Sequence, residues 1–488
     1  MSDKPTTKKP IKILAIGDTP ACATGFGVVM RNIFCKLGNT DDYEIDLIGI
    51  NDRGGWKDPK TYGKNVRIYP ASGLGYNDIF GRPRLINSLL VQDPDIKGPW
   101  DLVFTLNDPF IFEQPLPGYE SGTLSVLKDV QGGFREQFPP EFWFKTISYW
   151  PLDSACKRNW YENAIAKSDY PVAYCNYGAN EINKVEKQIG KSLIGNKLRT
   201  IYHGVNLGEY YPLPEDEVLA FRDKYSQGKI KPDTFWVSVI CRNQPRKDIP
   251  RAMKAFKEFQ KRRPDSFLYI HAKNNDVGGT LTEYANQLGL HLGEDWSYPT
   301  KFSENIGYPI EVLNKLYNAS DAVISTTLGE GFGLPLLEAM ATGTLNVAPD
   351  NTSIPELFNT ETGSDVKKLD DAEYLKKIRG ISVKCGNTSS EFYSLGSADL
   401  ERYRPLTNVD DMVQKLIWAY DNPDKVKQIE TQALEWVKQY TWDNIAKEWD
   451  KLFREAYSAL EVERKRWVKP KNSIGDKIPS KFNIKLGK

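Results

Sequence analysis

Two glutamates, Glu330 and Glu338, mark the stretch of this sequence that is best suited to chemistry. After Glu330 the sequence reads Gly331-Phe332-Gly333-Leu334-Pro335, and its two glycines allow a tight turn and close approach of the backbone to a ligand. Pro335 suits the first turn of a helix, and an apolar helical run then follows. Glu338 lies inside that run, where a carboxylate needs a partner because an unpaired buried charge is costly.

A glycine loop that opens a helix predicts a binding site for phosphate or sugar oxygens. The free backbone N–H groups and the positive end of the helix dipole both favour such ligands. Glu330 would lie on the loop, and Glu338 could accept hydrogen bonds from two neighbouring hydroxyls. The alternative is an ordinary amphipathic helix that tolerates one glutamate, since short glycine motifs also occur by chance.

A second cluster of chemical interest contains three cations, Arg242, Arg246 and Lys247. It directly follows an apolar run, residues 235–241, that reads as a buried strand, and it precedes an amphipathic helix. Arginine offers a bidentate fork and lysine a compact charge, so this turn is suited to a diphosphate. The alternative is a solvated basic turn.

Both segments resemble motifs of the retaining glycosyltransferases of family 4, which have the GT-B fold. The resemblance rests on Glu-Gly-Phe-Gly-Leu-Pro followed by Glu-Ala-Met-Ala-x-Gly, and on an Arg…Lys pair at positions 242 and 247. It implies that Glu338 holds the ribose of a nucleotide-sugar, that Glu330 contacts the donor sugar, and that Arg242 and Lys247 bind the diphosphate. Arg242, Lys247 and Glu330 are therefore the expected catalytic residues; the donor site would add Gly331, Phe332, Gly333 and Leu334.

The resemblance also implies an α/β fold with two Rossmann-like domains whose parallel sheets face each other across a cleft. It implies a last helix that crosses back to the first domain and a reaction with retention of anomeric configuration by front-face attack. Because Arg242 and Lys247 would supply the cations for the departing diphosphate, we expect no metal and no cofactor. Nucleotide-diphosphate sugar would then be the co-substrate.

The first half of the chain opens with residues 11–18, which read as a buried strand, followed by Thr24-Gly25-Phe26-Gly27 and a helical apolar stripe. Strand, glycine loop and helix form the start of a Rossmann-like unit, whose loop cradles phosphates, and this places Gly25 and Gly27 in the donor site. Met30 occupies the place of the third glycine of the dinucleotide fingerprint, so a simple tight turn remains an alternative.

Further strands alternate with helices, which predicts a parallel sheet with ligands at the carboxyl ends of its strands. Asp18, Asp108 and Asp153 follow predicted strands there, and we expect Asp108 and Asp153 on the acceptor or sugar side. For Asp153 a helix N-cap is an equal alternative. Asp93-Pro94-Asp95 is typical of a turn rather than a metal site. Residues 109–142, rich in Pro, Gly and aromatics, read as a long irregular binding loop or lid.

The chain of 488 residues is too long for one core and predicts several segments. They are a disordered N-terminus (1–10), an acceptor domain (11–206), a connector (207–234), a donor domain (235–440), a returning helix (441–463) and a basic tail (464–488). We read residues 365–404 as an insertion or irregular surface. The block of like charges in the tail favours a solubilising role, because such blocks are usually solvated. The alternative is a specific contact with DNA, RNA or an anionic membrane.

The composition describes an ordinary globular protein with a net charge of +1, so no global field marks a polyanion partner. Six scattered cysteines without a Cys-x-x-Cys pair indicate a reducing compartment and no zinc site. No signal peptide and no membrane span are evident, so we expect a cytoplasmic protein.

Taken together, the residues and the resemblance predict a nucleotide-sugar-dependent hexosyl- or pentosyltransferase. Its hydroxyl acceptor could be a glycan, a lipid, a protein or modified DNA. A nucleotide-sugar epimerase of the same fold and a non-catalytic nucleotide-sugar-binding protein are the alternatives. Donor base, sugar, acceptor and oligomeric state do not follow from the sequence.

Overall fold

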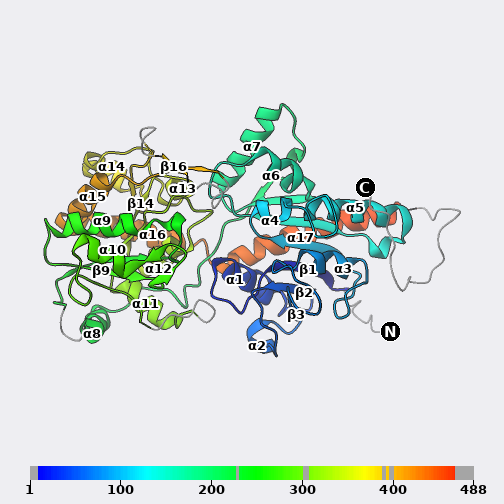
Figure 1. Ribbon diagram of the computed structural model, residues 1–488, viewed down its shortest axis with the longest axis horizontal. Helices are drawn as coiled ribbons and strands as arrows, with labels where there is room; N and C mark the ends of the chain where they lie inside the picture. The colour runs from blue at the N-terminus through cyan, green and yellow to red at the C-terminus, as the bar shows by residue number, and fades with distance from the viewer. Residues whose placement is uncertain (1–8, 227–229, 301–306, 387–391, 395–400, 468–488) are drawn as a thin grey trace, which may run out of the picture. The chain divides into compact units, whose positions relative to one another are not determined.

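The computed structural model describes residues 9–226, 230–300, 307–386, 392–394 and 401–467. They form two compact units. The first unit contains the described residues up to Tyr202 together with those from Trp442 onward, and the second contains those between His203 and Thr441. Each unit is a parallel α/β layer structure, as the alternation of strands and helices predicts (Figure 1).

The first unit is built on a seven-stranded parallel sheet in the order β3-β2-β1-β4-β5-β6-β7. The strands are β1 (Ile11–Asp18), β2 (Tyr43–Ile50), β3 (Val66–Pro70), β4 (Leu102–Leu106), β5 (Lys145–Trp150), β6 (Tyr170–Ala173) and β7 (Arg199–Thr200). The central strands β1 and β4 are buried on both faces, which explains their largely apolar sequences. The strand order reverses between β1 and β4, and such a switch point is where ligands bind in open α/β sheets.

Helices connect these strands. They are α1 (Gly25–Met30), η1 (Arg31–Cys35), α2 (Pro59–Tyr62), α3 (Arg82–Leu89), α4 (Pro109–Glu113), α5 (Thr123–Gln137), η2 (Pro140–Phe142), α6 (Arg158–Asn163), η3 (Ile165–Lys167), α7 (Asn176–Ile189) and η4 (Gly195–Lys197). The expectation of an irregular segment at 109–142 is therefore wrong. Its aromatic residues Phe112 and Phe134 are buried and anchor α4 and α5, so they are not free to stack on a ligand.

The last helix, α17 (Trp442–Lys465), belongs to the first unit, which confirms the expected return of the chain. Figure 1 shows it lying against the strands at the start of the chain. Its buried Trp449 packs edge-on against Phe104 of β4 and Tyr149 of β5, at ring distances of 5.4 and 4.8 Å. Asp450 accepts a 2.6 Å hydrogen bond from the hydroxyl of Tyr43. The apolar stripe of the helix thus completes one face of the sheet.

The second unit has a six-stranded parallel sheet in the order β12-β9-β8-β13-β14-β15. Its strands are β8 (Phe235–Ile240), β9 (Ser266–His271), β12 (Trp296–Ser297), β13 (Ala322–Ile324), β14 (Leu345–Pro349) and β15 (Ile381–Val383). Two short antiparallel hairpins accompany it, β10 (Asn275–Asp276) with β11 (Gly279–Thr280) and β16 (Phe392–Ser394) with β17 (Tyr403–Pro405). Because β15 is part of the core sheet, reading 365–404 as irregular surface is wrong for that strand.

The helices of this unit are α8 (Glu215–Ser226), η5 (Pro245–Lys247), α9 (Ile249–Gln260), α10 (Leu281–Leu288), α11 (Ile310–Asn318), α12 (Leu334–Thr342), α13 (Ile354–Phe358), η6 (Val366–Asp370), α14 (Ala372–Leu375), α15 (Val409–Asp421) and α16 (Pro423–Val437). The described part of 207–234, expected as a connector, belongs to this unit. Arg222 of α8 fixes it there by donating to the backbone oxygen of Ala319 and to Asp321 at 2.7 and 2.8 Å. Among the described residues, no helix is long and apolar enough to cross a membrane.

Candidate active site

The candidate site of the second unit lies where the strand order of its sheet reverses. Strands β8 and β13 are neighbours, with Ala322 opposite Val237, yet they are far apart in sequence. The basic turn 242–247 follows β8, and the glycine loop 328–333 follows β13. Parallel strands end at the same edge of a sheet, so both motifs meet there, at the position that α/β sheets use for ligands.

The side chains of Lys247 and Glu330 form an ion pair across this junction. The Lys247 ammonium donates to Glu330 Oε1, although the two residues are 83 positions apart. Only 12% of the Lys247 side chain and 14% of that of Glu330 are exposed. Arg246 lies 3.5 Å from Glu330 Oε2 and also donates to the backbone oxygen of Gly329. Burial pushes the pKa of Glu330 upward, but the two cations outweigh burial and hold this pKa below its ordinary value, so the carboxylate is ionised.

The glycine loop is held in place by three polar residues that follow β14. Thr352 accepts a 2.9 Å hydrogen bond from the backbone N–H of Glu330. Ser353 donates to the backbone oxygens of Glu330 and Phe332 at 3.1 and 2.8 Å, and Asn351 donates to that of Thr327 at 3.0 Å. Sequence reasoning missed these residues. The signal that could have found them is their position directly after the next strand of the sheet, where side chains reach the same edge.

The N-terminus of α12 begins at this loop. Gly333 has φ +107°, which an L side chain rarely adopts, and this explains the second glycine of the motif. Pro335 lacks an N–H, and the N–H groups of Leu336 and Leu337 donate to the backbone oxygen of Gly333 at 3.0 and 3.2 Å, so Leu334 supplies the N–H that this end could offer to a ligand. Phe332 is buried, with its ring 4.6 Å from that of His203, so only its backbone contributes to the loop surface.

Glu338 lies in the second turn of α12 and is half-buried. It accepts a 2.6 Å hydrogen bond from the hydroxyl of Tyr317, a fully buried residue of α11. Burial is the main influence and raises the pKa of Glu338 to about 7, although hydrogen bonds from Tyr317 and Tyr210 act in the opposite direction. Perturbed carboxyl groups occur often at functional sites, and the position of Glu338 on α12 after the glycine loop adds the geometric reason to consider it here.

Arg242, the other predicted diphosphate ligand, has a different partner. Its guanidinium donates to Asp276 of the β10–β11 hairpin at 2.9 and 3.4 Å. Its side chain is 49% exposed, whereas that of Asp276 is 7% exposed. The structure thus brings Lys247, Arg246 and Glu330 together and places Arg242 in a separate ion pair, so its role in diphosphate binding stays a prediction.

In the first unit, Gly25 and Gly27 lie in α1 rather than in an open loop. Thr24 caps this helix by accepting from the backbone N–H of Gly27 at 3.0 Å, and the Thr24 hydroxyl in turn donates to Asp18. A Cβ on Gly27 would come within 2.6 Å of the backbone oxygen of Cys22. The glycine at 27 is therefore required for packing, and a donor contact of either glycine stays a prediction.

The three predicted aspartates of the first unit do lie at the carboxyl edge of its sheet. Asp18 ends β1, while Asp108 and Asp153 follow the adjacent strands β4 and β5. Asp108 occupies the N-cap position of α4 without capping it through its side chain. Lys157 is the N-cap of α6, so Asp153 does not cap that helix. The acceptor or sugar role of Asp108 and Asp153 stays a prediction.

Asp93 and Asp95 both bind Arg84, whose guanidinium is almost fully buried, at 3.0 and 3.1 Å. This ion-pair cluster explains the Asp-Pro-Asp turn without a metal. Among the described residues, no group of three His, Cys, Asp or Glu side chains is placed to hold a metal ion. Most of the basic tail 464–488 lies outside the described residues, which end at 467. The same holds for residues 1–8 of the N-terminal segment 1–10.

Comparison with known families gives a match over the second unit. Residues 233–382 match the family model described as glycosyl transferases group 1, and this range contains both motif segments. The serotype-specific mannosyltransferase WbdA of Escherichia coli is 28% identical over 166 residues, which cover 32% of this chain and 18% of that protein. The match thus spans less than a fifth of the length of that relative.

Solved structures match over almost the whole chain. Sucrose-phosphate synthase from Thermosynechococcus elongatus has a TM-score of 0.63 at 16% identity, covering 93% of this chain and 100% of that chain. Anabaena HepE in complex with UDP and glucose has a TM-score of 0.58 at 14% identity, covering 91% and 100%. The trehalose 6-phosphate synthase of Burkholderia multivorans has a TM-score of 0.60 at 11% identity, covering 95% and 99%. At such identities the likeness shows the fold, and the chain has the GT-B fold.

Proposed function

We propose that this chain is a retaining, metal-independent glycosyltransferase that moves a hexosyl or pentosyl group from a nucleotide-diphosphate sugar to a hydroxyl acceptor. The observation that carries the proposal is the cluster of Arg246, Lys247 and Glu330 at the switch point of the second sheet. The match of residues 233–382 to a glycosyltransferase model supports it. A UDP-glucose complex among the structural neighbours supports a nucleotide-sugar as the donor.

In the proposed reaction, the bond between the anomeric carbon and the diphosphate oxygen breaks, and a bond to the acceptor oxygen forms on the same face of the sugar. The acceptor proton passes to the leaving diphosphate. Charge develops on the phosphate oxygens, and preorganised cations and helix dipoles lower the barrier by stabilising it. Arg246 and Lys247 surround one carboxylate, which leaves one positive charge for this purpose.

The remaining residues would position the donor. Glu330, oriented by Lys247, would accept hydrogen bonds from the sugar hydroxyls, and the N-terminus of α12 at Leu334 would face the diphosphate. Glu338 would accept from the two ribose hydroxyls in its ionised form. Arg242 would join the diphosphate only by sharing or leaving Asp276, so we expect it to contribute less than Lys247.

A panel of nucleotide-sugars, including UDP-glucose and GDP-mannose, tests the proposal. A specific donor at 100 times its Kd should stabilise the protein by about 2.7 kcal/mol, and nucleoside diphosphate should be released with EDTA present. Lys247→Ala should abolish both effects, whereas Lys254→Ala, an exposed lysine on α9, should change neither. NMR of the product reports the anomeric configuration. Epimerisation of the donor alone would indicate an epimerase. Binding without hydrolysis of the donor and without transfer to any hydroxyl acceptor offered would indicate a binding protein, and no stabilisation by any donor would refute the proposal.

A further inference from the structure

A hollow surface lies in the first unit, at the amino edge of its sheet. Lys145 is the first residue of β5 and Asp169 directly precedes β6, whereas Asp18, Asp108 and Asp153 lie at the opposite, carboxyl edge. The groove has a volume of about 610 Å³. We call it the amino-edge groove; it is lined by Lys128, Arg135, Trp143, Lys145, Arg466 and Trp467, together with the carboxylates of Asp169 and Glu463.

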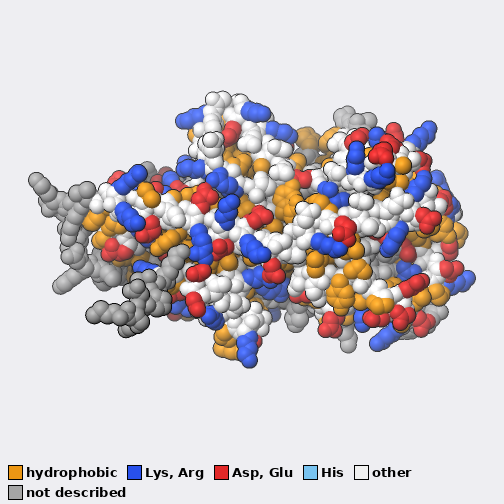
Figure 2. Space-filling view, turned by 180° about the vertical axis from the view of Figure 1, so that it is seen from behind, with side chains coloured by type: hydrophobic (Ala, Val, Ile, Leu, Met, Phe, Trp, Pro, Cys, Tyr) orange, Lys and Arg blue, Asp and Glu red, His pale blue; other side chains and the backbone are white. Residues whose placement is uncertain are grey.

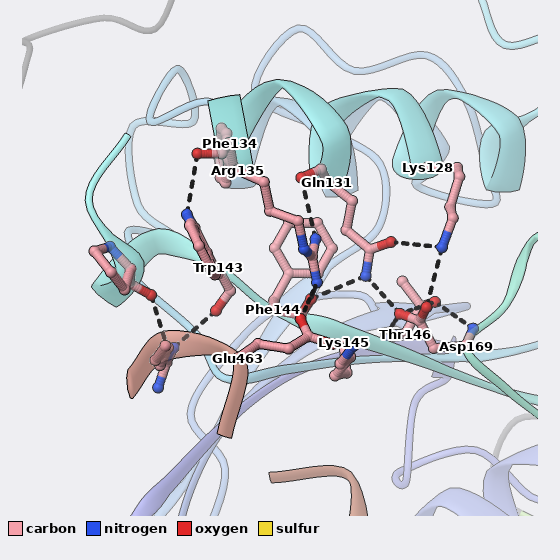
Figure 3. A network of polar contacts seen from close by, with 12 residues as sticks. Lys128, Gln131, Phe134, Arg135, Trp143, Phe144, Lys145, Thr146, Asp169 and Glu463 are labelled. Carbon is pink, nitrogen blue, oxygen red and sulfur yellow. Dashed lines mark hydrogen bonds and ion pairs between the residues drawn. The ribbon is translucent and has the colours of Figure 1, made fainter. Parts of the chain in front are cut away.

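Asp169 organises one side of the amino-edge groove, as Figure 3 shows. This buried carboxylate accepts from Lys128 at 3.0 Å, from the Gln131 amide at 2.5 Å and from the backbone N–H of Thr146 at 2.9 Å. Burial alone would raise the pKa of Asp169, but Lys128 and these hydrogen bonds outweigh it and lower this pKa. Lys128 is thereby held over the groove with 49% of its side chain exposed.

Glu463, near the end of α17, organises the other side. It accepts from Arg135 at 3.0 Å and from Lys145, so that α5, β5 and α17 converge on it (Figure 3). The next residue, Arg464, fixes the end of α17 by donating to Asp101 and to the backbone oxygen of Trp143, both at 2.7 Å. These contacts place Arg466 and Trp467 at the groove. Its four cations face two carboxylates, which leaves a surplus of two positive charges.

This surplus is local. The whole chain has a net charge of +1, and Figure 2 shows basic and acidic side chains interspersed over the visible face. A concave surface with guanidinium forks and lysines suits phosphate oxygens, and the half-buried Trp467 in its lining is an aromatic residue of the kind on which bases stack. The four cations of the groove come from α5, from β5 and from the residues after α17, so they line an open surface rather than one point. An extended polyanion matches this arrangement better than a small anion does.

We propose that the amino-edge groove binds the phosphate backbone of a nucleic acid, as a holding site separate from the carboxyl edge of the same sheet. Phosphate contacts supply affinity that falls with salt, while stacking on Trp467 adds affinity without sequence preference. The proposal does not depend on the glycosyltransferase function, because it concerns binding alone.

Fluorescence anisotropy tests the proposal. The full chain is titrated against a labelled 20-nucleotide DNA, single-stranded and as a duplex, between 50 and 200 mM salt. The double variant Lys128→Gln/Arg466→Gln removes one exposed and one half-exposed cation, and because Lys128 pairs with the buried Asp169, its melting temperature is measured alongside to show that it is folded. For the single strand we expect at least tenfold weaker binding at 50 mM salt and a salt slope smaller by about 1.4. Trp467→Ala should weaken binding about tenfold. The matched control Lys36→Gln, which removes an ion-paired cation outside the groove, should bind like the unaltered chain.

Three results would overturn the proposal. One is no binding of either DNA form at 50 mM salt. Another is equal weakening by Lys36→Gln and by the double variant, which would place the DNA elsewhere. The third is a competitor that displaces the labelled DNA better than unlabelled DNA does at equal phosphate or charge concentration. Stronger competition by heparin would assign the groove to an acidic glycan, and stronger competition by vesicles with anionic lipid would assign it to a membrane.

Discussion

The elevated pKa of Glu338 leads to a prediction about donor binding. In the free protein this carboxyl has a pKa of about 7, mainly because of burial. If Glu338 accepts hydrogen bonds from both ribose hydroxyls, only its ionised form can bind the donor fully. About one tenth of the protein is ionised there at pH 6 and about nine tenths at pH 8. The dissociation constant of a nucleotide-sugar should therefore be about tenfold higher at pH 6, which is about 1.4 kcal/mol.

Isothermal titration calorimetry with UDP-glucose, or with whichever donor stabilises the protein, measures this effect. A nucleotide-sugar is the right probe because its diphosphate diester does not titrate between pH 6 and pH 8, unlike a free nucleoside diphosphate. Glu338→Gln should bind more weakly at pH 8 and should lose the pH dependence. A wild-type dissociation constant that is the same at both pH values would refute the assignment of Glu338 to the ribose. So would a Glu338→Gln variant that keeps the tenfold change.

The same shift predicts the pH dependence of stability in the absence of ligand. The folded-state pKa of Glu338 lies above its ordinary value of 4.5, so between these two values the folded protein retains a proton that the unfolded chain releases. Stability should therefore fall as pH rises from about 4.5 to about 7, by up to about 3 kcal/mol. Glu338→Gln removes this cost, so above pH 7 the variant should melt at a higher temperature than the unaltered protein.

Three further predictions concern other parts of the structure. Lys247→Ala should lower the free energy of unfolding of the ligand-free second unit by about 1–3 kcal/mol, measured in urea, because it leaves the buried Glu330 carboxylate without its main partner. Adding Glu330→Gln should recover most of this loss. Additive effects of the two changes would contradict the pairing. Trp449→Ala should lower the free energy of unfolding by about 3–5 kcal/mol, because this fully buried ring joins α17 to β4 and β5. A loss below 1 kcal/mol would argue against the packing of this helix on the first sheet. Gly27→Ala should lower the melting temperature of the first unit and cost about 1–3 kcal/mol of unfolding free energy, because the new Cβ meets the backbone oxygen of Cys22. An unchanged calorimetric transition would show that α1 can shift.

Sequence alone determined the local features of this protein. The glycine–proline opening of α12, the strand before it and the basic turn after β8 depend on backbone preferences of neighbouring residues, and these are readable without knowing the rest of the fold. The alternation of strands and helices likewise predicted the α/β units, and the amphipathic stripe predicted the helix α17, whereas the family resemblance supplied the expectation that this helix returns to the first unit. Segment 109–142 was misread because its Pro, Gly and aromatic residues drew attention away from the helical spacing of Leu124, Leu127, Val130 and Phe134, which form the buried face of α5.

Tertiary structure decided which side chains meet. Lys247 pairs with Glu330 because β8 and β13 are adjacent in the sheet, and no spacing along the chain encodes that neighbourhood. The choice of Asp276 as the partner of Arg242 depends in the same way on a hairpin placed beside the basic turn. The neutral-range pKa of Glu338 arises from burial beside Tyr317, and the amino-edge groove from the convergence of α5, β5 and α17. Ion pairs, pKa values and grooves depend on distance and burial in space, and only the folded chain fixes those.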